Sequence, residues 1–167
     1  MYMATLEQIL RSRDERQSRQ KELLALNPGK TLVCLTVVMP GQDKRGLRSL
    51  IVAQAAMTAL LQHFGADKPF VEVRDLETGF EAFLLTEASA TDAKRAVCRI
   101  EDEHPLGRLF DLDVITRDGP LTRCQIGEQE RRCLLCPRPA RECMRLHRHG
   151  YAELQHKIDQ MIEAYVR

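Results

Sequence analysis

A short apolar run, Leu32 to Met39, most constrains the fold of this 167-residue chain. It reads LVCLTVVM, is rich in β-branched residues and stands between two Pro-Gly turns. Such a run is typical of a strand that is buried on both faces. It is far shorter than the about 18 apolar residues that a membrane-spanning helix needs. We therefore expect a central strand in a sheet, and we do not expect a membrane-spanning protein.

Composition excludes several other classes of protein. Lys and Arg number 25 and Asp and Glu 24, so the net charge of +1 gives no overall attraction for nucleic acid or anionic lipid. With 44% hydrophobic and 29% charged residues, we expect one globular domain over residues 1–167. The start of the chain, residues 1–4, is followed by charged residues from Glu7 on and has no apolar signal region, which favours a cytoplasmic protein.

The first helical pattern has an unusual polar middle. Leu6, Ile9 and Leu10 begin it, but residues 11–22 (RSRDERQSRQKE) contain no hydrophobic side chain. The hydrophobic effect cannot bury such a stretch, so one interpretation is a solvated helix held by charge pairs such as Glu15 with Arg19. Asn27-Pro28-Gly29 is expected to end it.

The remaining periodicity predicts an α+β (mixed α/β) fold whose sheet is covered by helices. Helices are expected at 47–65, 90–103 and 151–166, the last with a clean apolar face. Residues 70–74 and 80–86 form an expected hairpin around Glu77-Thr78-Gly79, with acidic residues along its outside. A further strand is expected at 109–116, followed by a turn at Asp118-Gly119-Pro120. Strand order stays open.

The loop Pro40 to Gly46 follows the central strand and precedes a helix. It contains Gly41, Lys44 and Arg45, and a strand, glycine loop and helix suit phosphate binding. The Walker spacing is absent, so an ordinary connecting loop is the other interpretation.

Two carboxylates project from one face of the strand at 109–116. Side chains alternate along a strand, so Asp111 and Asp113 share a face, with Leu109, and the opposite face is the core. Adjacent carboxylates repel unless a cation lies between them, and a partly hydrated Mg²⁺ suits such a pair beside a phosphate substrate. Two solvent-facing aspartates are the alternative. The core face carries Phe110, Leu112 and Val114.

A cysteine-rich knuckle covers about residues 124–149. Cys133-x2-Cys136 and Cys143 have zinc-ligand spacing, with His149 or His147 as the fourth ligand. Reduced cysteines packed in a small subdomain are the alternative. The stretch 131–149 also holds six arginines against one glutamate, although it lacks the aromatic side chains that stack on RNA bases.

Four blocks in order resemble the apo-citrate lyase phosphoribosyl-dephospho-coenzyme A transferases, the holo-acyl-carrier-protein synthases of citrate lyase. They cover nearly the whole chain. The blocks are 12–17 (SRDERQ), the central strand with Pro40-Gly41 and Lys44, 104–108 (HPLGR) with Asp111-x-Asp113-Val114, and 131–136 (RRCLLC) with Cys143 and His149.

The resemblance implies a nucleotidyltransferase-like sheet and a nucleotidyltransferase reaction. The 5-phosphoribosyl-dephospho-coenzyme A group would pass from 2'-(5-triphosphoribosyl)-3'-dephospho-coenzyme A to a serine of the acyl carrier (gamma) subunit, releasing pyrophosphate. On these positions, Asp111 and Asp113 would be catalytic and hold Mg²⁺. A set of basic residues would bind the triphosphate: Arg13, Arg16, Lys44 and Arg108, with His104 as a candidate to orient or protonate a phosphate.

Two further expectations concern partners. The basic stretch near the carboxyl end would dock an acidic carrier by charge complementarity, and zinc in the knuckle would be structural. The alternative function is a non-catalytic zinc-knuckle module that binds RNA or a protein through Arg131 to Arg148. For the enzyme, no nucleic-acid partner is expected.

Overall fold

The computed structural model describes residues 4–41, 44–67 and 69–167. Its helices are α1 (Leu6–Leu26), α2 (Leu47–Phe64), α3 (Ala90–Glu103), α4 (Ala140–Arg145) and α5 (Tyr151–Val166), with short 3-10 turns η1 (Gly65–Asp67), η2 (Gly107–Leu109) and η3 (Cys124–Ile126). The strands are β1 (Thr31–Val37), β2 (Phe70–Leu76), β3 (Gly79–Thr86), β4 (Phe110–Thr116) and β5 (Gly119–Leu121). The predicted helices at 90–103 and 151–166 are confirmed. No helix of the described ranges is long and apolar enough to cross a membrane.

The strands form one sheet in the order β2-β3-β1-β4-β5, with every neighbouring pair antiparallel. The α+β class and the central place of β1 are confirmed, but the expected mixed sheet is wrong. The chain runs β1-α2-β2 and β3-α3-β4, and each crossover skips one strand. Parallel strands are therefore second neighbours, which is the split βαβ arrangement of ferredoxin-like folds.

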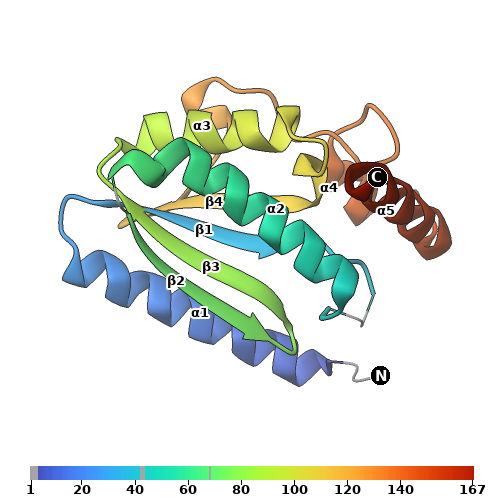
Figure 1. Ribbon diagram of the computed structural model, residues 1–167, viewed down its shortest axis with the longest axis horizontal. Coiled ribbons are helices and arrows are strands. Elements are labelled where there is room, and N and C mark those ends of the chain that lie inside the picture. Colours follow the sequence, from blue (N-terminus) through green and yellow to red (C-terminus); the bar gives the residue numbers. More distant parts are fainter. Residues whose placement is uncertain (1–3, 42–43, 68) are drawn as a thin grey trace.

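One face of the sheet carries the main apolar core. Helices α2 and α3 cover this face, as Figure 1 shows, and α5 lies at its end. Leu35 and Leu112 of the sheet belong to the same buried cluster as Val52 of α2, Val97 of α3 and Ile158 of α5. Burial of this size is the dominant stabilising contribution to a fold.

Helix α1 covers the opposite face alone (Figure 1). Its last turns bury Leu23 and Leu24 against a second, smaller apolar cluster that contains Cys34 and Phe83. The polar middle continues as helix and rests on polar sheet residues: Ser12 accepts a hydrogen bond from Thr78, and Arg16 and Arg19 reach the sheet. Positions spaced three and four apart thus face the sheet even where they are charged.

The charge pairs of α1 connect mainly to other elements. The expected Glu15–Arg19 pair is wrong, because Arg19 pairs with Glu72 of β2 and with Glu22, both at 2.6 Å, and Glu15 lies 3.4 Å from Arg74. The acidic residues of the hairpin do not all lie on its outside, since Glu81 is only 2% exposed beneath α1. A fully solvated helix is therefore also ruled out for this segment.

Side chains close most of the outer edge of β4. Strand β5 pairs only with residues 114–116, so the first half of β4 lacks a strand neighbour on that side. The buried Glu101 of α3 accepts a hydrogen bond from the backbone N–H of Leu112 at 2.9 Å. Arg131 donates to the carbonyl oxygens of Arg108 and Phe110, both at 2.6 Å. Buried backbone groups need such partners.

The segment before β4 packs tightly against the end of α3. Leu109 belongs to η2 and is buried in the main core, so its expected place beside the aspartates is wrong. Strand alternation begins only at Phe110. At Gly107, a Cβ would lie 2.5 Å from the carbonyl oxygen of Glu101 and 2.6 Å from that of Ile100. Only glycine allows this approach of two backbones.

Replacing Gly107 by alanine should destabilise the fold. The added methyl meets backbone atoms that cannot rotate away, so we expect a loss of about 1–3 kcal/mol in the free energy of unfolding, measured by urea denaturation. Gly65→Ala is the matched control, because Gly65 has φ −68° and a Cβ there meets nothing within 4 Å. A Gly107→Ala protein as stable as the control would contradict this packing.

Candidate active site and metal cluster

The two aspartates of β4 lie on the sheet face that α1 covers, with Asp111 partly exposed and Asp113 exposed. The register pairs Asp111 with Thr36 and Asp113 with Cys34 of β1, and the Thr36 hydroxyl donates to Asp111 at 3.1 Å. Leu112, between them, belongs to the core on the other face. The predicted shared face is therefore confirmed, and it is the face that α1 covers with polar side chains.

Arg16 extends from α1 onto this face. It ion-pairs with the buried Glu81 at 3.3 Å, and its charge acts on Asp113 and on the Cys34 thiol. Arg74 of β2 approaches the other oxygen of Glu81 at 3.0 Å. Glu15 also lies 3.4 Å from Arg74, so two arginines and two carboxylates balance in charge here, and the ion pair with Glu81 holds Arg16 on the face that carries the aspartates.

Glu81 was not among the sequence candidates. Burial raises the pKa of its carboxyl, against the effect of Arg74 and Arg16, which lower it. The ion pairs oppose that desolvation, and such a buried carboxylate fixes the position of its partners. The sequence contained a sign of this burial. In residues 80–86 (FEAFLLT), Glu81 and Phe83 are two positions apart and therefore share one face of the strand, so the charged residue lies on the same side as a large apolar one.

Lys44 and Arg13 lie near each other, close to the β2–β3 turn. Desolvation and the nearby charge of Arg13 both lower the pKa of Lys44, whose ammonium donates to the carbonyl oxygen of Met39. Gly79, at the β2–β3 turn, lies next to Lys44. Of the predicted glycine loop, Gln42 and Asp43 lie outside the described residues.

Asp113 is the more perturbed of the two aspartates. Desolvation by surrounding protein and the charge of Asp111 raise its pKa, although the side chain still contacts solvent. Asp111 has more favourable partners, namely Thr36 and the guanidinium of Arg131 at 3.4 Å. The pair is thus asymmetric in its contacts, with Asp111 held by donors and Asp113 open to solvent.

The other two candidates lie elsewhere. His104 accepts a hydrogen bond from the backbone of Leu106 at 3.0 Å and packs on Phe110, whose side chain is in the core, and on Tyr165. Burial lowers the pKa of this imidazole. Because Phe110 and Asp111 point to opposite faces, His104 is separated from the carboxylates by the sheet. Arg108 lines a cavity beside the cysteine knuckle.

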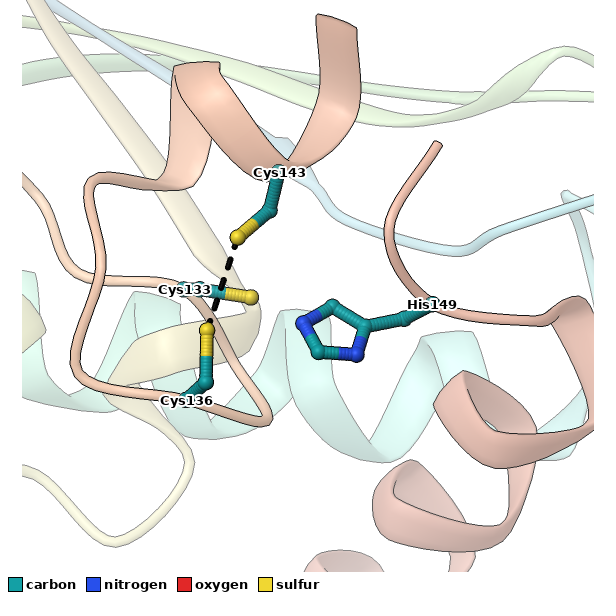
Figure 2. Close-up of side chains that lie close together, drawn as sticks. All are labelled: Cys133, Cys136, Cys143 and His149. Carbon is teal, nitrogen blue, oxygen red and sulfur yellow. Dashed lines mark hydrogen bonds between the residues drawn. The ribbon is translucent and has the colours of Figure 1, made fainter. Parts of the chain in front are cut away.

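Cys133, Cys136, Cys143 and His149 converge on one point. Figure 2 shows the three sulfurs and the imidazole directed toward one another, and one ligand atom from each lies within 4.8 Å of all the others. The Nε2 atom of His149 is buried without a hydrogen-bond partner among the described residues. Three sulfurs and one imidazole nitrogen are the donor set of tetrahedral zinc.

The chain reversal after α4 selects His149 over His147. Helix α4 ends at Arg145, and His147 has φ 46°, a left-handed conformation that turns the chain back. The backbone N–H of Arg148 then donates to the carbonyl oxygen of Cys143 at 3.1 Å. His147 is exposed and Cys124 lies outside the cluster, so the fourth donor is His149.

The thiols of this cluster differ in acidity. Desolvation acts to raise the pKa of Cys133, but hydrogen bonds from the backbone of Leu135 and Cys136 lower it overall. Desolvation and hydrogen bonds with its neighbours raise the pKa of Cys143 to about 12. Several thiolates cannot form together here without a cation, and metal binding supplies one.

The site as a whole places carboxylates and arginines together, as enzymes that act on phosphate groups require, and comparison with known proteins identifies a transferase. Residues 4–165 match the family model of apo-citrate lyase phosphoribosyl-dephospho-CoA transferase. The chain belongs to this family and installs the prosthetic group of citrate lyase. This membership excludes the non-catalytic module.

Similar proteins match over nearly their whole length. A probable apo-citrate lyase phosphoribosyl-dephospho-CoA transferase of Vibrio cholerae is 41% identical, covering 96% of this chain and 93% of its own. The enzyme of that name from Citrobacter koseri is 38% identical over 96% and 90%. A probable enzyme from Streptococcus pyogenes is 34% identical over 96% and 86%.

Asp113→Asn should make the protein more stable at pH 7. The folded state raises the pKa of this carboxyl above its usual value, so stability is lost as the pH rises through that pKa. Removing the charge should raise Tm by up to about 2 °C, a modest gain because the side chain contacts solvent. The gain should shrink toward acidic pH. Asp118→Asn, in the turn after β4, is the control, and a lower Tm for Asp113→Asn would contradict the assignment.

His149→Ala should remove metal from the cluster whereas His147→Ala should not. Zinc per chain, measured by atomic emission, should fall from about one equivalent to near zero only in the first variant. Cys124→Ser is a second control. A wild-type protein that is purified without chelators, binds no added zinc and keeps the same Tm in EDTA would instead indicate reduced, packed cysteines.

Proposed function

We propose that the face beneath α1 catalyses transfer of the 5-phosphoribosyl-dephospho-CoA group from its triphosphate precursor, 2'-(5-triphosphoribosyl)-3'-dephospho-CoA, to a serine of the apo acyl carrier subunit. The serine oxygen bonds to the α-phosphorus, and the bond from that phosphorus to pyrophosphate breaks. This is nucleotidyltransferase chemistry, which depends mainly on positioning and on stabilising negative charge. The observation that carries the proposal is that Asp111 and Asp113 share a sheet face with Arg16, whose charge acts on Asp113.

The residues of this face have separate roles. Arg16, held by Glu81, and the nearby Arg13 and Lys44 contact the anionic triphosphate oxygens. Asp111 and Asp113 would hold Mg²⁺, which would neutralise charge on the α-phosphate and the pyrophosphate.

The serine proton passes to one of the two carboxylates. Asp113 is the better acceptor, because it is exposed to an incoming hydroxyl whereas its neighbour Asp111 is held by Thr36 and Arg131.

The Cys133, Cys136, Cys143 and His149 cluster is proposed to bind structural zinc. All four positions of a tetrahedral ion would be taken by protein, which leaves no open position for a substrate. What supports this role is the link from the cluster to β4: Arg131, two residues before Cys133, contacts Asp111 and two backbone carbonyls. Zinc would therefore hold the strand that carries the aspartates.

The acyl carrier subunit is proposed to dock on the arginines of the knuckle. Arg131 is engaged with β4, and Arg138 and Arg148 pair with Glu142. The exposed remainder, with no ion pair among the described residues, is Arg132, Arg141 and Arg145. Charge complementarity with an acidic carrier would act through these three side chains.

Intact mass of the apo acyl carrier subunit, after incubation with this protein, Mg²⁺ and the triphosphate precursor, tests the function. We expect a serine-linked mass gain with pyrophosphate release. Asp111→Asn should slow transfer by about 10²–10⁴-fold, because charge stabilisation and proton transfer each have effects of this size. Asp118→Asn is the matched control, with Tm measured for both.

Two outcomes of this assay would count against the assignments. Transfer by Asp111→Asn at the wild-type rate would show that the aspartates are not part of the catalytic site. A Michaelis constant for the carrier that does not change with salt concentration would contradict the proposed arginine docking surface.

A further inference from the structure

A cavity of about 590 Å³ lies beside η2, next to the start of β4, and has no role in the transfer described above. Its walls come from the end of α3, from η2 and from the knuckle loop. Its volume is that of a small-molecule or cofactor site. Three arginines line it together with an apolar stretch of the knuckle loop.

The charges of this cavity leave cations for a ligand. Arg123 is engaged by Glu101 at 2.6 Å and by Asp102 at 2.9 Å. Arg108 has no carboxylate within ion-pair distance among the residues described. Desolvation and the charge of Arg131 lower its pKa, against the effects of Asp102 and Glu101, which raise it. Of the charged lining residues, this leaves Arg108 and Arg132 facing the single free acid Glu130.

Part of the cavity wall is apolar. Leu134, Leu135 and Pro137 of the knuckle loop line it, and Leu134 also packs against the main core. Arginines beside an aliphatic wall fit a ligand with an anionic group attached to a flexible arm that contains aliphatic segments. Dephospho-CoA has this chemistry, because its diphosphate is joined to the pantetheine arm.

Arg131 connects a wall of the cavity to the aspartates. It donates to the carbonyl oxygen of Arg108, which lines the cavity, and its guanidinium lies 3.4 Å from Asp111. The donor has two anionic groups, a triphosphate at one end and a diphosphate within the dephospho-CoA part. A site beneath α1 and a second one beside η2 would hold one group each.

We propose that this cavity binds the diphosphate and pantetheine part of the donor, with Arg108 as the diphosphate contact. The inference rests on the proposed function for the identity of the donor. Arg108, which the sequence resemblance assigned to the triphosphate, is thereby assigned to the diphosphate of the same molecule. Binding energy from this remote, non-reacting part would position the triphosphate over Asp111 and Asp113.

The test measures binding of dephospho-CoA alone, which has no triphosphate and cannot react, to the full chain by isothermal titration calorimetry. Arg108→Gln should weaken binding about tenfold or more, because it removes a charge-assisted contact. Arg132→Gln is the second variant if Arg108→Gln fails to fold. Arg99→Gln, exposed on α3 and outside the cavity, is the matched control and should bind as the wild type does.

Asp111→Asn separates this inference from the proposed function. It should lose transfer but bind dephospho-CoA normally, and inorganic triphosphate should not displace dephospho-CoA from the wild type. Wild-type affinity in folded Arg108→Gln, displacement by triphosphate, or no binding to the wild type at millimolar dephospho-CoA would each overturn the cavity assignment. If Asp111→Asn still transfers while Arg108→Gln loses binding, the proposed catalytic site fails and the cavity assignment stands.

Discussion

The unpaired edge of β4 is the constraint on which most of this structure depends. A strand edge inside a protein leaves N–H and C=O groups that need partners. Here the partners are side chains: Glu101 from α3 accepts from Leu112, and Arg131 donates to Arg108 and Phe110. Glu101 also binds Arg123 and Arg131, so one buried carboxylate joins α3, the sheet and the segment that leads into the knuckle. The same strand carries both aspartates.

The two faces of the sheet differ in polarity. The face under α2 and α3 is apolar and supplies stability, whereas the face under α1 buries fewer apolar side chains and carries more charged ones. Only the last turns of α1, with Leu23 and Leu24, add apolar contacts there. Glu81, buried between Arg16 and Arg74, is costly to desolvate and strongly destabilising if one partner is lost. Such arrangements persist where they position functional groups.

The cluster of Cys133, Cys136, Cys143 and His149 extends this argument to the carboxyl-terminal third of the chain. Few apolar side chains in the knuckle are buried, so little burial holds its loop and the short helix α4 in place. A bound ion would replace the missing core, because four protein ligands fix four points of the backbone at once. Through the contacts of Arg131, the ion would also help to position Asp111 and the wall of the cavity beside Arg108.

The sequence by itself determined the local elements and the donor types. The apolar run at β1, the helix patterns of α3 and α5, the alternation that puts Asp111 and Asp113 on one face, and the Cys133-x2-Cys136 spacing are all local patterns, and local backbone geometry is sufficient to read them. The resemblance of four ordered blocks gave the family.

Only the tertiary structure decided which of these residues meet. The crossovers skip a strand, so that all neighbouring strands are antiparallel. Helix α1 covers the acidic face, where Arg16 and Arg19 form ion pairs with Glu81 and Glu72. The turn at His147 chose His149 as the fourth donor, and the sheet placed His104 away from the aspartates. Contacts such as Arg131 with Asp111 join residues that are distant in sequence, and no periodicity encodes them, because the position of each partner depends on how the whole chain packs.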